Sequence, residues 1–283
     1  MTSCQPEEAT LAGFDHSVRA WGRSNEYVHL TESSTGSWWY AEGMQTLSSI
    51  VALNILHGGG RRTSKLIEWL REQNADIVVL SEWRNNPNGV AIKDALKSSG
   101  YDVHCQEGSI TNGVLIAAKE PFDAIAVTPP NAQIGVLLKA QWKGGLAVIG
   151  AYFPLAIPSQ REFFDVCIKS AKQHSDAPFL LVGDLNAGSN DADLEAGATP
   201  FPCAVNFVAL TNGGLIDQWR QHHGMTEREY TWRSRQNGFR IDHAFGNKAF
   251  LTRYEPLRCD YDHSTRESKL SDHSALILRL ASS

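Results

Sequence analysis

The chain has 283 residues, of which 42% are hydrophobic and 20% charged, with a formal net charge of −5. This balance is typical of a globular protein that can bury a sizeable core. No apolar run approaches the roughly 18 residues of a membrane span, and no basic start with an apolar stretch marks a secretory signal. We therefore expect a soluble, cytoplasmic monomer that does not bind a membrane.

Cysteine spacing and local charge indicate which classes of protein the chain can belong to. The scattered cysteines are Cys4, Cys105, Cys167, Cys203 and Cys259. Their odd number and irregular spacing disfavour a disulfide framework and a zinc knuckle, so we expect reduced thiols. The negative net charge gives no global attraction to nucleic acid, but binding depends on local cations, and arginines cluster around Arg61 and around Arg240.

Hydrophobic periodicity divides the chain into a short extension and a longer domain. Residues 1–45 are polar with isolated aromatic residues and no sustained period, which indicates an N-terminal extension of unknown role. From residue 46 to 281, strand and helix signals alternate. The predicted strands are 49–56, 77–81, 103–104, 113–118, 135–142, 146–153, 179–183, 230–233, 240–246 and 275–280. The predicted helices are 64–72, 90–98 and a segment that Pro158 opens.

Alternating strands and helices, mixed with a glycine-turn hairpin at 144–145, predict two sheets packed together with helices outside. An acidic residue directly follows each of two predicted strands, Glu82 after 77–81 and Asp184 after 179–183, and the pair Asp272-His273 directly precedes another apolar run. Ligands in such folds lie beyond the carboxyl ends of the strands. Carboxylates are preferred ligands of Mg²⁺, so the pattern predicts a divalent-metal site for phosphate chemistry.

Six short elements, taken in chain order, carry a resemblance to a known family. They are Leu53-Asn54, Ser81-Glu82, Tyr152-Phe153-Pro154, Gly183-Asp184-Leu185-Asn186, Arg240-Ile241-Asp242-His243 and Ser271-Asp272-His273. This series resembles the endonuclease/exonuclease/phosphatase superfamily from about residue 46 to 281. Tyr152 and the stretch from Tyr230 to Asp242 are most similar to the exonuclease III-type and abasic (AP) endonuclease branch. The resemblance implies a four-layered α/β/β/α sandwich of two packed mixed sheets.

The resemblance also implies a metal-dependent phosphodiester hydrolase that acts on DNA, including DNA with abasic sites, in DNA repair. Glu82, Asp272 and Asn54 would contact Mg²⁺, for which Mn²⁺ would substitute. Asp184 would orient and deprotonate the attacking water, while Asn186 and Asn54 would position water or phosphate.

His273 would face the scissile phosphate, with Asp242 fixing its ring, and Tyr152 would contact the phosphate. Trp232 and Phe239 would form the wall of a pocket for an extrahelical sugar, with packing in the core as the competing interpretation. We expect Arg240 and Arg61 to bind substrate.

The tripeptide Asp-His-Ser occurs twice, beginning at residues 262 and 272. Only the second precedes an alternating apolar strand, so we assign catalysis to that copy.

Three departures from the family pattern weaken the substrate assignment. Leu56 stands where family nucleases often carry an acid, and the adjacent His57 is either a replacement metal contact or a polar turn residue. Leu155 stands where abasic endonucleases place an Asn, and His243 follows Asp242 in place of a commoner Tyr or Leu. The alternatives are a phosphatase or phosphodiesterase of the same fold acting on a small or lipid phosphoester, and a non-catalytic scaffold.

Overall fold

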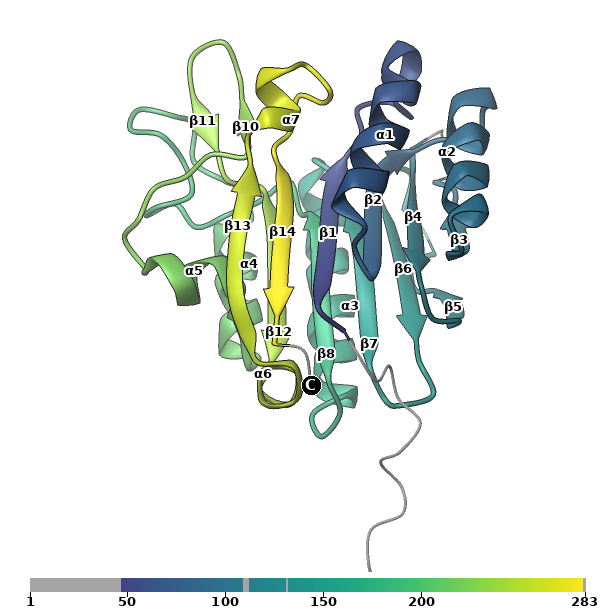
Figure 1. Ribbon diagram of the computed structural model, residues 1–283. Coiled ribbons are helices and arrows are strands. Elements are labelled where there is room, and N and C mark those ends of the chain that lie inside the picture. Colours follow the sequence, from purple (N-terminus) through teal and green to yellow (C-terminus); the bar gives the residue numbers. More distant parts are fainter. Residues whose placement is uncertain (1–46, 109–111, 131, 282–283) are drawn as a thin grey trace, which may run out of the picture. The chain divides into compact units, whose positions relative to one another are not determined.

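The computed structural model describes residues 47–108, 112–130 and 132–281 (Figure 1). Two six-stranded sheets make up most of this part of the chain. The predicted extension, residues 1–45, lies outside the described residues and stays a prediction. None of the helices in the described ranges combines the length and the apolar character needed to cross a lipid bilayer.

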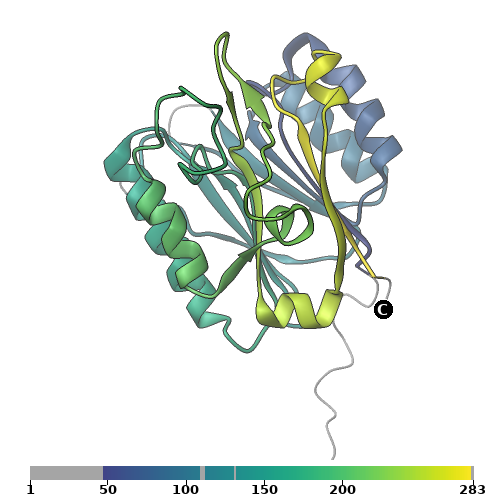
Figure 2. The same ribbon diagram turned by 90° about the vertical axis from the view of Figure 1, so that its left-hand side faces the viewer.

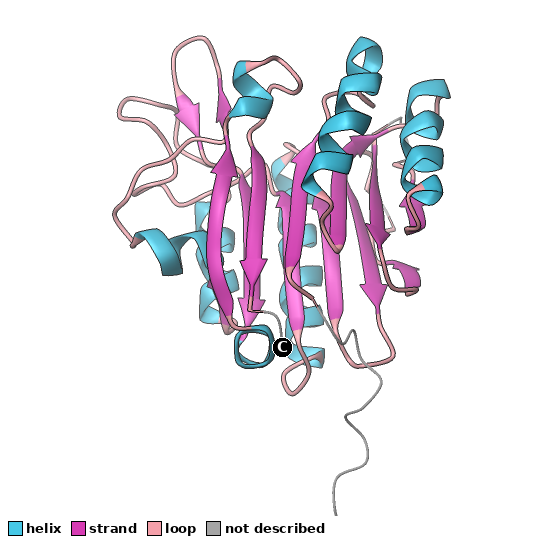
Figure 3. Ribbon diagram, in the orientation of Figure 1, coloured by secondary structure: helices cyan, strands magenta, loops and turns pink. Residues whose placement is uncertain are grey.

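The first sheet has the strand order β13-β14-β1-β2-β4-β3, and its strands lie side by side in Figure 3. They are β1 (Ser49–Asn54), β2 (Ile77–Trp83), β3 (Asp102–Gln106), β4 (Gly113–Ala118), β13 (Pro256–Asp262) and β14 (Ala275–Leu280). β1 and β2 are parallel, and the chain passes between them through the short turn η1 (Gly60–Arg62) and helix α1 (Thr63–Gln73). Helix α2 (Pro87–Ser98) lies beside α1 on the same side of this sheet (Figure 1).

The second sheet has the order β5-β6-β7-β8-β12-β9. Its strands are β5 (Asp123–Ala126), β6 (Val136–Gln141), β7 (Ala147–Tyr152), β8 (Phe179–Asp184), β9 (Leu215–Asp217) and β12 (Asp242–Asn247). β7 and β8 are parallel and are joined by α3 (Ile157–Gln173), which lies on the outer side with α4 (Ala204–Asn212) (Figure 2). The smaller elements are α5 (Gln218–His223), α6 (Lys248–Tyr254), α7 (Ser264–Glu267) and the hairpin of β10 (Trp232–Arg233) and β11 (Gly238–Phe239).

Apolar side chains on both faces of the central strands build the layers. Successive residues of a strand point to opposite faces, so Ile50 and Ala52 of β1 enter the core between the sheets, whereas Val51 and Leu53 contact the helical side. Parallel strands covered on both faces need such continuous apolar runs. The result is helices, sheet, sheet, helices, which confirms the predicted four-layered sandwich.

Most predicted elements are present, with boundaries set by local capping and exposure. The helix predicted from residue 90 begins at Pro87 because the Asn86 side chain caps it, accepting a hydrogen bond from the Gly89 amide at 3.0 Å. Strand β13 was not predicted, because most of its residues are exposed or half-buried and form no apolar run.

Gly183 allows close contact between β7 and β8 directly before Asp184. Its φ is +136°, and a Cβ built there would lie 2.3 Å from the Ala151 carbonyl oxygen. A glycine is therefore required at the end of the strand that carries a predicted catalytic residue.

Arg240 is fully buried in a network of charges at one edge of the second sheet. Its Nε lies 2.6 Å from Asp193 Oδ1 and its Nη2 lies 2.6 Å from Asp217 Oδ2, while Arg220 also pairs with Asp193. Burial opposes ionisation of Asp217, but the adjacent Arg240 outweighs burial and holds the pKa of this carboxyl well below its usual range. The structure contradicts the prediction that Arg240 binds substrate, because both ends of its guanidinium are engaged in the interior.

The same network contacts the backbone at the start of β12. Arg240 Nη1 donates to the Tyr261 hydroxyl at 3.4 Å, and that hydroxyl donates to the Asp242 carbonyl at 2.7 Å. Arg240 therefore stabilises the backbone at Asp242.

We expect Gly183→Ala to lower the free energy of unfolding by about 1–3 kcal/mol, because a methyl group would force β7 and β8 apart. Urea unfolding would measure this. Gly100→Ala is the matched control, since Gly100 also has a positive φ (+87°) but has open space around its Cβ position. Equal losses in the two variants would contradict the role given to close strand approach.

Arg240→Leu should lower the free energy of unfolding by about 3–5 kcal/mol, because it leaves buried aspartates without their cation. The urea midpoint of the variant measures the loss. Arg161→Leu, on the exposed surface of α3, should change the same quantity by less than about 0.5 kcal/mol. An unshifted midpoint for Arg240→Leu would show that the charge network does not stabilise the fold.

Acid should weaken the protein through Asp217. Its folded-state pKa is depressed, so its stabilising contribution is complete above the unfolded-state pKa of about 3.9 and is lost as the pH falls below that value. Urea unfolding between pH 6 and pH 3 should show a steeper loss for the wild type than for Asp217→Asn. Parallel pH profiles would contradict the assignment.

Candidate active site

Residues from both sheets meet at the carboxyl ends of β1, β2, β7 and β8. Strand register places Tyr152 and Asp242 on either side of Asp184 in the second sheet. Asn54, the last residue of β1, reaches across: its Nδ2 lies 3.0 Å from Asp184 Oδ2 and 3.2 Å from Glu82 Oε1. Predicted site residues separated by more than a hundred positions therefore lie in one place.

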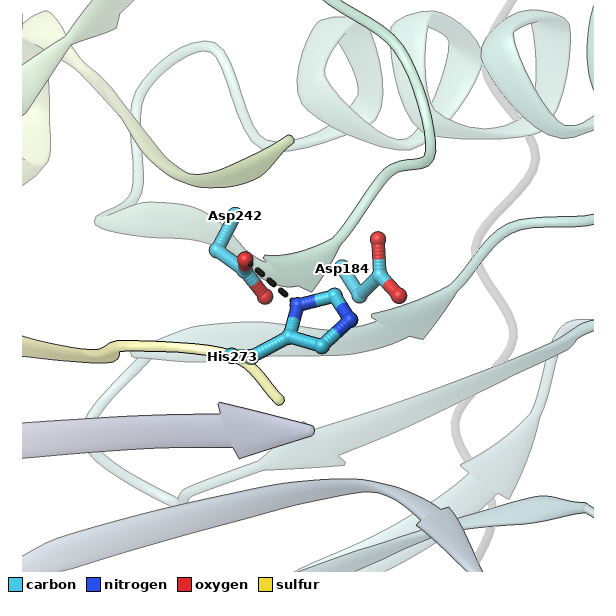
Figure 4. Close-up of side chains that lie close together, drawn as sticks. All are labelled: Asp184, Asp242 and His273. Carbon is cyan, nitrogen blue, oxygen red and sulfur yellow. Dashed lines mark hydrogen bonds and ion pairs between the residues drawn. The ribbon is translucent and has the colours of Figure 1, made fainter. Parts of the chain in front are cut away.

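Asp184, Asp242 and His273 form the centre of the site (Figure 4). Each offers one ligand atom, and these atoms all lie within 4.8 Å of one another, so the three could hold a metal ion. However, His273 Nδ1 already lies 2.8 Å from Asp242 Oδ2. This contact fixes the imidazole ring and directs Nε2 away from Asp242 (Figure 4).

The local charges set the protonation of two of these groups. Burial opposes the charged form of His273, but Asp242 outweighs burial and raises the pKa of His273 to about 10. Burial and the adjacent Asp242 raise the pKa of Asp184 to about 7, against the opposing charge of His273. At neutral pH the site thus combines an imidazolium with a carboxyl group that can take up or release a proton.

A local distortion of β2 presents Glu82 to the cleft. Glu82 has a left-handed φ of +57° and lies at a register shift between Ser81 and Trp83. Its Oε2 accepts a hydrogen bond from the His57 amide at 2.8 Å. The backbone departs from strand geometry to direct the carboxylate, as β-bulges beside functional sites often do.

Asn186 also has a left-handed φ, +46°. Its amide nitrogen donates to Asp184 Oδ1 at 2.9 Å, and its side-chain Nδ2 donates to the Phe153 carbonyl at 2.8 Å. The local turn is therefore held by the Asp184 side chain, and Asn186 is anchored at the edge of the cleft.

Of the two carboxylate oxygens of Asp272, one accepts a hydrogen bond and the other has no partner among the described residues. Its Oδ2 accepts a hydrogen bond from Trp232 Nε1 at 3.1 Å. Its Oδ1 is buried and has no hydrogen-bond partner among the residues that the structure describes. A buried carboxylate oxygen without a partner is costly unless a cation or donor approaches it, so this atom fits a metal ligand.

The cleft above these groups has a volume of about 460 Å³ and a polar and an apolar end. Eight predicted residues line it: Glu82, Tyr152, Asp184, Asn186, Trp232, Phe239, Asp272 and His273. Asn54 and Asp242 are buried beside them, in hydrogen-bond contact with lining residues. Arg61 is exposed on η1 and does not line the cleft, and Arg240 belongs to the buried charge network.

Aromatic side chains form the apolar end. Trp232 and Phe239 are half-buried with ring centroids 5.9 Å apart, and they pack on a small cluster that includes Ile241. Phe201, between two prolines, lies edge-on to Phe239 at 5.7 Å and also lines the cleft. The aromatic pair therefore both packs and faces the cleft. Phe201 escaped the sequence analysis because it lies in a loop without periodicity.

Tyr152 lines the cleft beside Asp184. Burial, followed by the negative charge of Glu82, raises the pKa of its hydroxyl well above the usual value. Asn112 Nδ2 lies 3.4 Å from this hydroxyl. Tyr152 is therefore a neutral phenol that can donate a hydrogen bond.

His57 lies beside Glu82, where the family pattern led us to expect an acid nearby. Its Nδ1 is 2.9 Å from Glu82 Oε2 and 2.9 Å from Arg84 Nη2, and 61% of its side chain is exposed. The imidazole thus lines the polar end of the cleft. Its participation in metal binding stays a prediction.

Sequence and fold comparisons agree with this geometry. The sequence pattern of the endonuclease/exonuclease/phosphatase family matches residues 51–273. The fold is similar to that of an AP endonuclease from Archaeoglobus fulgidus, with a TM-score of 0.68 and 20% identity, covering 82% of this chain and 99% of that one. The 3′ phosphatase NExo from Neisseria, bound to a product DNA hairpin, gives a TM-score of 0.67 and 20% identity, covering 83% and 99%. Truncated TDP2 from Caenorhabditis elegans gives 0.62 and 17%, covering 82% and 97%.

The structural likenesses, at 20% identity and below, show a shared fold, whereas the family match spans most of the sequence. The chain therefore belongs to the endonuclease/exonuclease/phosphatase family, and its fold is exonuclease III-like.

Proposed function

We propose that the protein is a Mg²⁺-dependent phosphodiester hydrolase that acts on DNA, of the exonuclease III/AP-endonuclease type, and that it serves DNA repair. The observation that carries the proposal is the meeting of Asp184 with the His273–Asp242 pair beside Glu82 and Asp272. These groups supply a proton acceptor, a cation and oxygen ligands within one cleft. A cytoplasmic location and a monomeric state stay predictions from the sequence.

The oxygen-rich end of the cleft fits Mg²⁺. Glu82 and Asp272 would hold the ion, Asn54 orients Glu82, and Mn²⁺ would substitute because it accepts the same ligands. When bound, the ion would offset negative charge on the phosphate oxygens. His273 is a poorer candidate ligand, because a pKa of about 10 keeps its ring protonated at neutral pH.

Asp184 is the residue suited to accept a proton from the attacking water. A general base works best when its pKa lies near the working pH, and burial beside Asp242 raises the pKa of Asp184 to about 7. Asn54 and the Asn186 amide hydrogen-bond its two oxygens and so fix its direction. Orientation therefore comes from Asn54 and Asn186, whose hydrogen bonds favour the charged carboxylate, whereas basicity comes from burial and Asp242, which outweigh them.

His273 and Tyr152 are suited to stabilise the phosphate. The imidazolium of His273 supplies positive charge and an N–H donor, and Asp242 prevents the ring from turning. The Tyr152 hydroxyl supplies a neutral donor from the adjacent strand. Donors fixed before the reaction stabilise developing charge without a reorganisation cost.

Two features support DNA as the substrate. The apolar wall of Phe201, Trp232 and Phe239 could accept a sugar turned out of the duplex, which is cheapest at a damaged site. The similar folds include an AP endonuclease and a phosphatase bound to a DNA hairpin. Arg61, exposed on η1, is free of the buried charge network and could contact the DNA backbone.

Cleavage of an end-labelled duplex carrying one abasic-site analogue would test the function. We expect Mg²⁺-dependent incision at the lesion that EDTA abolishes, and Asp184→Asn should lower kcat by about 10²- to 10⁴-fold through loss of the base. Asp165→Asn, an exposed carboxyl on α3, is the matched control and should keep full activity.

The pattern of products separates the alternatives. Digestion from the ends without lesion preference would indicate a general exonuclease. Absence of DNA cleavage, with turnover of a small or lipid phosphoester that depends on Asp184, would replace DNA with that substrate class. Full activity of Asp184→Asn would contradict the role of this residue.

A further inference from the structure

The first Asp-His-Ser tripeptide, which begins at Asp262, lies outside the catalytic cleft but directly supports it. Asp262 ends β13, and the chain then forms the single turn of α7 beside β10 (Figure 1). Trp69 Nε1 of α1 donates to Asp262 Oδ2 at 3.1 Å, and the Ser264 amide donates to Asp262 Oδ1 at 3.0 Å. His263 is therefore held between two anchored neighbours.

Both ring nitrogens of His263 make contacts to segments of the active site. Its Nδ1 lies 2.8 Å from the hydroxyl of Ser274, the residue after His273. Its Nε2 lies 3.3 Å from Glu229 Oε2, three residues before Trp232. The imidazole thus connects the segment of His273 to the segment that carries the aromatic wall.

Additional hydrogen bonds stiffen each end of this connection. Arg266 Nε donates to the Ser274 hydroxyl at 3.2 Å, so the hydroxyl hydrogen is free to point to His263 Nδ1. Glu229 Oε1 accepts the Tyr230 amide at 2.8 Å. The hydrogen bond from His263 holds the pKa of Glu229 below its usual value, as expected for an ionised acceptor.

The two joined segments fix the direction of Asp272, a proposed metal ligand. The Ser274 amide donates to the Thr231 carbonyl at 2.8 Å, and Trp232 and His273 form an antiparallel bridge. Trp232 Nε1 then donates to Asp272 Oδ2. A shift of the Trp232 segment would therefore change both the aromatic wall and the direction of the Asp272 carboxylate.

We propose that His263 is a positioning residue for the hydrolytic site, joining the His273 segment to the Trp232 segment so that Trp232 orients Asp272. The proposal rests on the proposed function for its catalytic consequence. Its structural content, the coupling of His263 to the Trp232 indole, stands independently of any activity.

The kinetic test compares His263→Leu, which removes the polar contacts of the ring, with His263→Gln, whose amide retains an acceptor and a donor. We expect His263→Leu to lower kcat for DNA cleavage by about 10- to 100-fold, as loss of a group that orients a ligand does, and His263→Gln to recover most of it. His104→Leu is the control, because His104 also pairs with an aspartate but lies on β3 outside the cleft. Equal kcat values for His263→Leu and His104→Leu would overturn the proposal.

A double-mutant cycle tests whether His263 acts through Trp232. Trp232→Phe removes the indole donor, so His263→Leu should cost much less in that background than in the wild type. An equal cost in both backgrounds would show that His263 does not act through Trp232.

Nuclear magnetic resonance provides a readout that needs no activity. The Trp232 indole N–H signal, assigned by its absence from Trp232→Phe, should shift in His263→Leu and stay in place in His104→Leu. An unmoved signal would overturn the proposal even if activity fell. If the wild type cleaved no phosphodiester, the proposed function would fail, and the indole signal would still decide the positioning role.

Discussion

The side-chain amide of Asn54 joins the two sheets at the point on which the site depends. It donates to Asp184 at the end of β8 and to Glu82 at the bulged end of β2, so one residue fixes the separation of two carboxylates. This contact is possible because the sheets pack face to face and the carboxyl ends of both parallel pairs lie at the same edge. The remaining groups are arranged around this pair of acids.

Burying several charged groups at one edge of the sheets costs free energy, which oppositely charged neighbours must offset. Asp242 keeps His273 charged despite burial, and Asp242 together with burial brings the pKa of Asp184 to about 7. Next to the site, Arg240 pairs with two buried aspartates, Asp193 and Asp217. Arg240 lies two residues before Asp242 and contacts its backbone through Tyr261, so the charge network helps to hold the geometry of the site.

Strained backbone is concentrated where the cleft is formed. Glu82, Asn186, Leu56 and His57 all have left-handed φ values, and all four line the cleft. Such conformations cost about 1–3 kcal/mol each and persist only where surrounding structure imposes them. Here the buried strands before them impose the strain, and side chains at strand ends are turned toward the substrate space instead of along the sheet.

Much of this protein follows from the sequence alone. Apolar runs at strand length and helical periods between them predicted two sheets with outer helices, and acids at strand ends predicted Glu82 and Asp184 in one cleft. These features are local, because periodicity and strand polarity act over a few residues. The tertiary structure decided which charges are buried: Arg240 resembled a substrate contact, but its partners, Asp193 and Asp217, are distant in sequence. It also decided that Asp272 pairs with Trp232, that Phe201 completes the wall and that His263 supports the site, because such contacts arise only when loops without periodicity are brought together by the packing of the two sheets.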